Sequence, residues 1–447
     1  MNILIKYFAI CGGLWAGLAQ SLSGATAPSY SEMVPNTTAL KAGTNGVLSI
    51  EEVELAVLRE NPSLKAARAN WEAMKQRVPQ ARAWQDPRAG FDTVAGRFVS
   101  IPPNSFTDQK LTVEQAVPLS GRNRLRGEAA EAEAMVAFAD MHRRELDLLA
   151  RGRTLYYALA NARAQLRINQ SNTELLERFA EISRAKYEAG SKPESDVLIA
   201  ETDLAKLHEL KADILRQISD AESQLNVVMN RPAQSPLPGQ EELRPFTLEL
   251  ELTPLQDLAL TNRPELLMAR KKIEVAEANL RAARREWIPD PSLEMEASRY
   301  NDAGQAVSEL MAGVSIDLPW FNRRKYKAAI EEARQNKAAA AFELESAQKE
   351  TLGLVRDALQ KVETFHHHVE LFSDRILPLA RQNLTATRLE YETDKTGFLN
   401  LIDAQRTLQE VEATYWNHLT DYLSAVAELE SVVGAEPRRA TERHDSH

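Results

Sequence analysis

Apolar residues recur at alternating steps of three and four positions along several long segments of this 447-residue chain. Such spacing is the contact seam of a coiled coil, so it predicts long helices that pack side by side. One seam contains Val197, Ala200, Leu204, Leu207, Ile214, Ile218, Ala221, Leu225 and Val228. A second contains Leu401, Ala404, Leu408, Val411, Tyr415, Tyr422, Ala425, Leu429 and Val432. The helical pattern over 122–186 alone predicts a helix about 97 Å long, which exceeds what a globular domain needs.

Other segments alternate apolar and polar residues with a period of two, which predicts strands with one apolar and one polar face. The clearest alternation contains the apolar residues Leu293, Met295 and Ala297, and then Leu310, Ala312, Val314, Ile316 and Leu318. Segments 88–95 and 108–117 alternate less regularly. Outer-membrane barrels have this pattern because lipid contacts one face and water the other. A half-buried sheet in a soluble domain is the alternative, but we find no other apolar sheet that could cover these strands. The predicted strands are also too few to close a barrel within one chain.

Short landmarks occur twice in the same order, with their matching residues 201 to 204 positions apart, such as Pro118 and Pro319. They are Pro62-Ser63-Leu64 with Pro264-Glu265-Leu266, Trp84 with Trp287, Asp86-Pro87 with Asp290-Pro291, VPLSGRNR (117–124) with DLPWFNRR (317–324), and YEAGSKPESDVL (187–198) with YETDKTGFLNLI (391–402). A period of about 200 residues is too long for a solenoid unit, so we infer that one half-molecule was duplicated. The expected repeats are residues 47–231 and 253–434, with linkers at 26–46 and 232–252 (Pro-rich) and a polar tail at 435–447.

Residues 1–25 have the pattern of a secretory signal peptide. Lys6 precedes an apolar run at 7–19, and the small residue Ala25 offers a cleavage site. The run is short for a membrane span, which needs about 20 residues. Cys11, the only cysteine, follows Ile10, whereas a lipoprotein signal needs a small residue there. Loss of this segment leaves a chain without thiols, which suits the oxidising periplasm.

Composition and charge exclude several classes of function. The formal net charge is −10 and no basic stripe is present, which argues against nucleic acid as a partner. No phosphate-binding loop, catalytic triad or zinc-protease motif occurs, so the sequence predicts neither an enzyme nor a cofactor. Three adjacent histidines, His366 to His368, point about 100° apart on a helix and cannot converge on one metal ion. His444 and His447 lie in the polar tail. We therefore predict no metal site.

These landmarks resemble the outer-membrane efflux proteins of the TolC type over about residues 47–434. The segments LPWFNRRK (318–325), VPLSGRNRLR (117–126) and ARAW (81–84) before Asp86-Pro87 resemble the CzcC-like heavy-metal efflux branch. The resemblance implies a mainly α fold with a membrane β-barrel, in which each coiled-coil half carries one β-hairpin. It also implies a homotrimer whose protomers share a 12-stranded barrel in outer-membrane lipid above a periplasmic α-helical tunnel.

The function implied is that of a passive exit duct in a tripartite efflux system. Its partners are a periplasmic adaptor and an inner-membrane pump, and its cargo in the heavy-metal branch is a metal cation. A soluble periplasmic coiled-coil adaptor or scaffold is the alternative, because it would share the signal peptide and the coiled-coil seams. Such a protein has no use for amphipathic strands, and we find no lipoyl-like β-domain in the chain.

The resemblance assigns roles to residues at the periplasmic tip, where the long helices turn. Asp403 matches an aspartate of the inner constriction, and Asn400 replaces a second one. Tyr391 matches a tyrosine that closes the tip by contacting an acidic residue, here Asp196. Taken without the resemblance, each of these residues is equally well explained as a solvated tip residue.

The tip turns contain two glycines, Gly190 and Gly397, and Gly190 suits a turn that needs a positive φ. Pro193 fits the first turn of the returning helix. The arginine that closes the tip in the family is replaced by Thr396, and Asp394 occupies the second glycine position. Both departures weaken the expected closed state.

A second group of residues is expected at the inner rim of the barrel. Trp84, Trp287 and Trp320 are placed to form an aromatic belt at the membrane surface. Arg122 and Arg323 open long helices, where the helix dipole disfavours cations. Anionic lipid headgroups beside them explain the arginines better than a merely solvated helix start does.

Overall fold

The computed structural model describes residues 46–93, 108–246, 248, 250–302 and 305–435. The chain divides into two units, Met1–Val47 and Leu48–His447, and nearly all described residues belong to the second. The expected signal peptide, all of the first linker except Gly46 and all of the tail except residue 435 lie outside the described residues. None of the described helices is long and apolar enough to cross a membrane.

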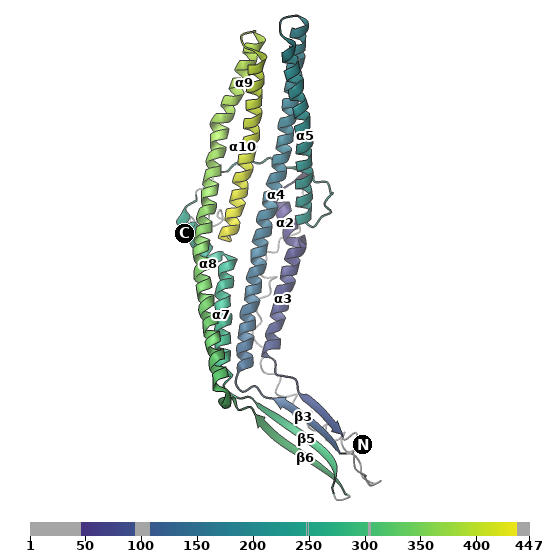
Figure 1. The fold of residues 1–447 in the computed structure, drawn as a ribbon, viewed down its shortest axis with the longest axis vertical. Helices are drawn as coiled ribbons and strands as arrows, with labels where there is room; N and C mark the ends of the chain where they lie inside the picture. Colours follow the sequence, from purple (N-terminus) through teal and green to yellow (C-terminus); the bar gives the residue numbers. More distant parts are fainter. Residues whose placement is uncertain (1–45, 94–107, 247, 249, 303–304, 436–447) are drawn as a thin grey trace. The chain divides into compact units, whose positions relative to one another are not determined.

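The second unit repeats one order of elements, as Figure 1 shows. After β1 (Val47–Leu48), the first half consists of α2 (Ile50–Glu60), α3 (Pro62–Arg82), β2 (Arg88–Thr93), β3 (Gln109–Ala116), α4 (Arg122–Glu188) and α5 (Glu194–Val228). After β4 (Gly239–Gln240), the second half consists of α6 (Leu252–Asn262), α7 (Pro264–Arg285), β5 (Pro291–Asp302), β6 (Gln305–Ile316), η2 (Pro319–Asn322), α8 (Arg323–Leu371), η3 (Phe372–Ile376), α9 (Leu377–Glu392) and α10 (Phe398–Val433). This repeated order agrees with the inferred duplication.

The helix starts follow from local chemistry. Ser49 caps α2 in a capping box, since its side chain accepts from the Glu52 N–H while the Glu52 carboxylate accepts from the Ser49 N–H. Asn61 caps α3, and Pro62 occupies the first turn, where no N–H is needed. Pro264 has the same place in α7.

One predicted long helix is interrupted. Whereas α4 runs for 67 residues without a break, α8 ends at Leu371 and continues as a π-helical turn, η3, before α9. The Leu377 N–H donates to the Phe372 carbonyl, five residues back. Pro378 follows directly and has no N–H to donate, which explains why the regular ladder is lost here.

The four-stranded sheet has the antiparallel order β2-β3-β5-β6. Its register places apolar residues in continuous rows across the strands, such as Phe91, Leu111, Ala297 and Leu310. The opposite face is polar, and on it Lys110 forms an ion pair with Glu296 at 2.7 Å. The predicted alternation is therefore correct. The apolar face is uncovered in the described chain, since Leu310 is 72% exposed and Val314 is 70% exposed.

Among the described residues, three apolar clusters join helices other than α3 and α7. One joins α8 and α10 to α6 and contains Val355, Tyr422 and Leu429. Another joins α4 and α5 to α2 and contains Tyr156 and Leu225. The third joins α4, α5, α9 and α10 near the tips and contains Leu176, Phe179, Ala200, Leu207, Leu384, Tyr391, Phe398, Leu401, Ile402 and Ala404. The two halves thus share a core, and α4 packs along α10 (Figure 1).

The predicted Pro-rich linker, 232–252, lies against both halves. Leu237 is buried in the cluster around Tyr156, and the Gln240 side-chain amide donates to the Tyr156 carbonyl at 2.9 Å. On the other half, the Tyr422 hydroxyl donates to the Phe246 carbonyl at 2.5 Å. Hydrogen bonds from side chains to backbone carbonyls therefore hold the linker against the helices. The composition of the linker does not predict these contacts.

Arg153 forms an ion-pair triad that connects the two halves. Its guanidinium contacts Glu54 of α2 at 2.5 Å and also contacts Glu430 of α10. The side chains of Arg153, Glu54 and Glu430 are only 15%, 23% and 15% exposed. Removal of the cation would take the Arg153 guanidinium away from two largely buried carboxylates.

We expect Arg153→Met to lower the free energy of unfolding by about 3 kcal/mol, because removing one partner of a largely buried ion pair is costly. Arg216→Met is the matched control, since Arg216 pairs with Asp220 at 3.1 Å while its side chain is 65% exposed. We expect that control to change stability by at most about 1 kcal/mol. Urea unfolding in detergent, followed by circular dichroism, measures both. Equal losses in the two variants would contradict a bridging role for the triad.

Candidate functional sites at the helical tips and the strand–helix junction

The two tip turns have the same backbone path. Gly190 ends the α4 side with a φ of 71°, and Asp394 ends the α9 side with a φ of 56°. Pro193 and Gly397 then precede α5 and α10 in extended conformations, with φ values of −75° and −85°. The positive φ predicted for Gly190 is confirmed. Gly397 lies in its turn but does not need the conformational freedom of glycine, because that need falls on Asp394.

Tyr391 is buried at the base of these turns, with 1% of its surface exposed. Its hydroxyl oxygen lies 3.4 Å from the Ser183 hydroxyl oxygen of α4. Lys186 covers the ring, with Nζ 4.5 Å from the ring centre, and donates to the Tyr391 carbonyl at 3.1 Å. The sequence did not single out Ser183 or Lys186, because their role depends on how α4 faces α9.

The expected hydrogen bond between Tyr391 and Asp196 does not occur among the contacts described within this chain. The Tyr391 hydroxyl faces Ser183 instead, because the tyrosine belongs to the apolar cluster that joins the four tip helices. Asp196 is half-buried at the start of α5, and this burial raises the pKa of its carboxyl. A role for Asp196 in closing the tip stays a prediction.

Asp394 connects the two tip turns through lysines. Its carboxylate accepts a hydrogen bond from Lys186 at 2.9 Å and lies 3.5 Å from Lys192. The hydrogen bond from Lys186 holds the pKa of Asp394 below its usual range. Asp394 therefore combines two roles, since it adopts the left-handed turn conformation and anchors the neighbouring helical hairpin.

The residues expected at the constriction lie on α10. The Asp403 side chain is 60% exposed, and its nearest cation is Arg406 at 3.6 Å. The Arg406 guanidinium already pairs with the buried Asp203 of α5. Its Nη2 lies 2.6 Å and 2.9 Å from the two carboxylate oxygens of Asp203. Asn400, one turn before Asp403, donates to the Thr396 hydroxyl at 2.8 Å. Asp403 thus keeps an exposed carboxylate beside a cation that is already paired.

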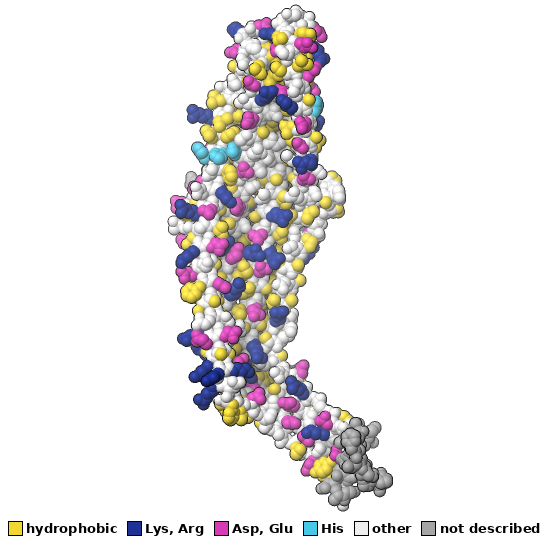
Figure 2. All heavy atoms as spheres, in the orientation of Figure 1, with side chains coloured by type: hydrophobic (Ala, Val, Ile, Leu, Met, Phe, Trp, Pro, Cys, Tyr) yellow, Lys and Arg dark blue, Asp and Glu magenta, His cyan; other side chains and the backbone are white. Residues whose placement is uncertain are grey.

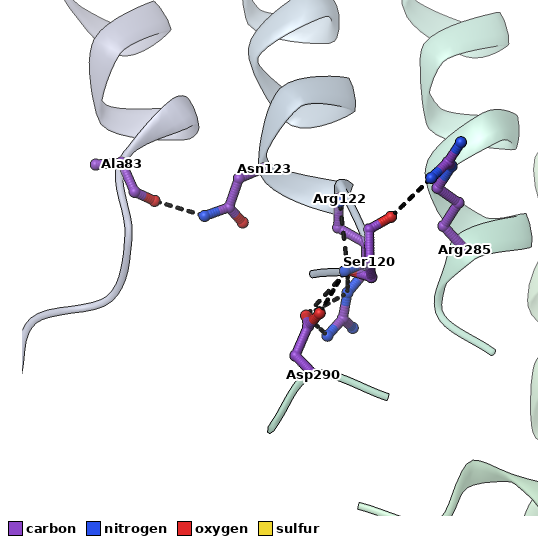
Figure 3. A network of polar contacts seen from close by, with 6 residues as sticks. All are labelled: Ala83, Ser120, Arg122, Asn123, Arg285 and Asp290. Carbon is purple, nitrogen blue, oxygen red and sulfur yellow. Dashed lines mark hydrogen bonds and ion pairs between the residues drawn. The ribbon is translucent and has the colours of Figure 1, made fainter. Parts of the chain in front are cut away.

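A polar network closes the junction between the sheet and the helices (Figure 3). The Asp290 carboxylate, just before β5, accepts from the Ser120 N–H at 2.7 Å and from the Ser120 hydroxyl at 3.0 Å. Arg122, the first residue of α4, donates to the same carboxylate from Nη2 at 2.5 Å and from Nε at 3.2 Å. Burial alone would raise the pKa of Asp290, but the hydrogen bonds from Arg122 and Ser120 lower it. The network joins the two repeats.

The tryptophans expected at the rim lie close to this junction in sequence and differ in exposure. Trp84 is 54% exposed and Trp320 is 43% exposed. Trp287 packs edge to face against Tyr326, with ring centres 6.0 Å apart. Lysines and arginines gather where α8 begins (Figure 2), and Arg323 is exposed there. Arg122 differs from its counterpart Arg323, because it is held by Asp290.

The histidines do not form a cluster that could hold a metal ion among the described residues. His368 reaches across to His418 of α10, with ring centres 4.7 Å apart, while the His366 ring packs at a tilt against Tyr422. Burial and the neighbouring His368 lower the pKa of His418. His444 and His447 lie outside the described residues.

The family model that matches this chain covers each of its two repeats separately. The family model for "Outer membrane efflux protein" matches residues 56–231 and 255–435. The cobalt-zinc-cadmium resistance protein CzcC of Cupriavidus metallidurans is 22% identical over 414 residues, which cover 87% of this chain and 90% of CzcC. The alkaline protease secretion protein AprF of Pseudomonas aeruginosa is also 22% identical, over 68% of this chain and 64% of AprF.

A solved structure of the outer-membrane channel OprN superposes with a TM-score of 0.74 at 19% sequence identity. The superposition covers 86% of this chain and 90% of OprN. At this level of identity the likeness establishes the fold alone.

The tip turns give a matched pair of glycine substitutions. Gly190→Ala places a side chain in a left-handed conformation, which costs about 1–2 kcal/mol. Gly397→Ala meets no such penalty, and both positions have open space around the added carbon. We expect faster hydrogen exchange at the tip amides of Gly190→Ala only. Similar exchange in the two variants would contradict the assigned turn geometry.

Proposed function

This chain belongs to the outer membrane efflux protein family, and on that premise we propose that it is the exit duct of a tripartite efflux system. The family consists of non-enzymatic channels in the outer membrane of the Gram-negative envelope. In our proposal, a periplasmic adaptor and an inner-membrane pump deliver the cargo, and this protein carries it passively outward.

The observation that carries the proposal is the uncovered apolar face of the sheet. Rows of apolar side chains cross all four strands, and Leu310 and Val314 are 72% and 70% exposed. Such a surface is unfavourable in water but suits the hydrocarbon core of a membrane. The opposite polar face, with the Lys110–Glu296 ion pair, suits a water-filled interior. An adaptor or scaffold would leave the apolar face without a role.

The sheet also supports a trimeric assembly. Within the described chain, β2 and β6 are the outer strands and each has one unpaired edge. Unpaired backbone groups are not tolerated in lipid, so the edges need partners from other copies. We propose three copies whose hairpins close one 12-stranded barrel, with Trp84, Trp287 and Trp320 at its inner rim beside lipid headgroups.

The cargo we propose is a heavy-metal cation. The name of CzcC describes cobalt, zinc and cadmium resistance, whereas AprF, at the same identity, is named for protease secretion. Overall similarity therefore does not select the cargo. The support comes from Asp403, because three exposed carboxylates around a threefold axis would attract cations and repel anions. Asn400 would line the same path without adding charge.

Channel recordings test the duct and its tip together. We expect the protein to require detergent for extraction and to conduct ions in planar bilayers. Block by divalent or trivalent cations added on the periplasmic side should weaken at least tenfold in Asp403→Ala, because the carboxylate ring is removed.

Asn400→Ala is the control, since it changes a neutral residue one turn away and should leave the block unchanged. A conducting wild-type channel that multivalent cations do not block would show that Asp403 only shapes the tip. A water-soluble monomer without conductance would refute the duct itself.

A further inference from the structure

The network around Asp290 and Arg122 joins the two repeats. The duplication gives each of these two residues an equivalent, but the two equivalents do not meet within the chain. Asp86-Pro87 precedes β2 as Asp290-Pro291 precedes β5, and Arg323 opens α8 as Arg122 opens α4. Asp290 and Arg122 contact each other at 2.5 Å. Asp86 and Arg323 are both exposed, and neither forms an ion pair among the contacts described for this chain.

The strand order explains this difference. Asp290 and Arg122 meet because β5 and β3 are neighbours in the sheet. The equivalent neighbours of the second junction would be β2 and β6, which occupy opposite edges. Three strand spacings of about 4.8 Å separate those edges, or about 14 Å, so the two edges do not pair with each other within one four-stranded sheet.

We propose that Arg323 pairs with Asp86 of a neighbouring copy, repeating across the subunit boundary the ion pair that Arg122 and Asp290 form inside the chain. This inference rests on the proposed ring of copies. It specifies which residues meet at the boundary and in which register β6 pairs with β2 of the next copy.

The register follows from the internal repeat. In the first hairpin Arg88 lies opposite Glu114, and in the second Ser292 lies opposite Ser315. These pairings agree with a shift of 204 residues on the first strand of each hairpin, as from Asp86 to Asp290, and of 201 residues on the second, as from Arg122 to Arg323. The β3–β5 pair ends with Ala116 opposite Ser292. The same shifts place Asp317 opposite Arg88 of the neighbouring copy.

Two features of this register were not used to derive it. Asp317 and Arg88 have opposite charges, so their juxtaposition is favourable. Three positions along, Val314 falls opposite Phe91 of the neighbouring copy, and both residues belong to the apolar face. A slip of one residue would put apolar side chains on the polar face. In this register, the apolar face and the polar face of the sheet both continue across the subunit boundary.

The counterpart junction differs in one respect. Phe321 occupies the place of Ser120, so the hydroxyl that donates to Asp290 is missing. The Phe321 side chain is 87% exposed. The boundary pair therefore relies more heavily on the Arg323 guanidinium than the internal pair relies on Arg122.

Charge reversal in the full-length protein tests the ion pair. Arg323→Asp places two carboxylates together and should lower the temperature at which the detergent-solubilised oligomer dissociates. The double variant Arg323→Asp with Asp86→Arg should restore that temperature. Size-exclusion chromatography with light scattering measures dissociation, and planar-bilayer conductance reports separately on the channel.

Disulfide formation tests the register. In a Cys11→Ser background, Arg88→Cys with Asp317→Cys puts two cysteines directly opposite each other, at a Cα separation that a disulfide accepts. Oxidation should yield covalent trimers on non-reducing gels. Arg88→Cys with Ile316→Cys is the control, because Ile316 points to the other face and should not cross-link.

Covalent trimers and restoration by the double variant support the inference. A conducting trimer that neither cross-links at 88 and 317 nor recovers in the double variant would overturn it while leaving the exit duct intact. A non-conducting monomer would refute the proposed function instead.

Discussion

The main constraint on this structure is that the backbone groups along the outer edges of its sheet need hydrogen-bond partners. Strands β2 and β6 each leave one row of N–H and C=O groups without a partner in the described chain. In lipid these groups need hydrogen-bond partners, whereas the exposed apolar face around Leu310 and Val314 suits lipid as it is. One chain does not supply partners for both edges, because the four strands of its sheet do not close on themselves. This constraint is the reason for the proposal that other copies of the chain complete the sheet.

The helical part meets a different requirement, which is to hold long helices side by side with few aromatic residues. Its three apolar clusters combine leucine, valine and alanine at seam positions with a few buried aromatic residues, and charged contacts tie the helices together between them. Arg153 connects α4 to α2 and α10, while Asp394 connects the two tip turns through Lys186. These contacts join one repeat to the other, so each half is stabilised by the half it duplicates.

The sequence predicted those features that depend on local patterning. The long helix that begins at Arg122 follows from periodicity, and the alternating strands follow from the period of two. Features that depend on how helices rotate against each other were missed. Tyr391 faces Ser183 and Lys186 rather than Asp196, and Arg406 is engaged by Asp203, because these pairings arise between helices that are far apart in sequence. The break at η3 was also missed, although Pro378 was visible as its local cause.

The central claim is that one face of the sheet contacts lipid, and cysteine labelling along β6 tests it most directly. The chain's only cysteine, Cys11, lies in the predicted signal peptide, so single cysteines can be introduced at successive positions from Glu309 to Ile316 in a Cys11→Ser background. In membrane vesicles, a charged thiol reagent should label positions 309, 313 and 315 and spare positions 310, 312 and 314. Uniform labelling along the strand, or protection of the polar positions instead, would contradict the account.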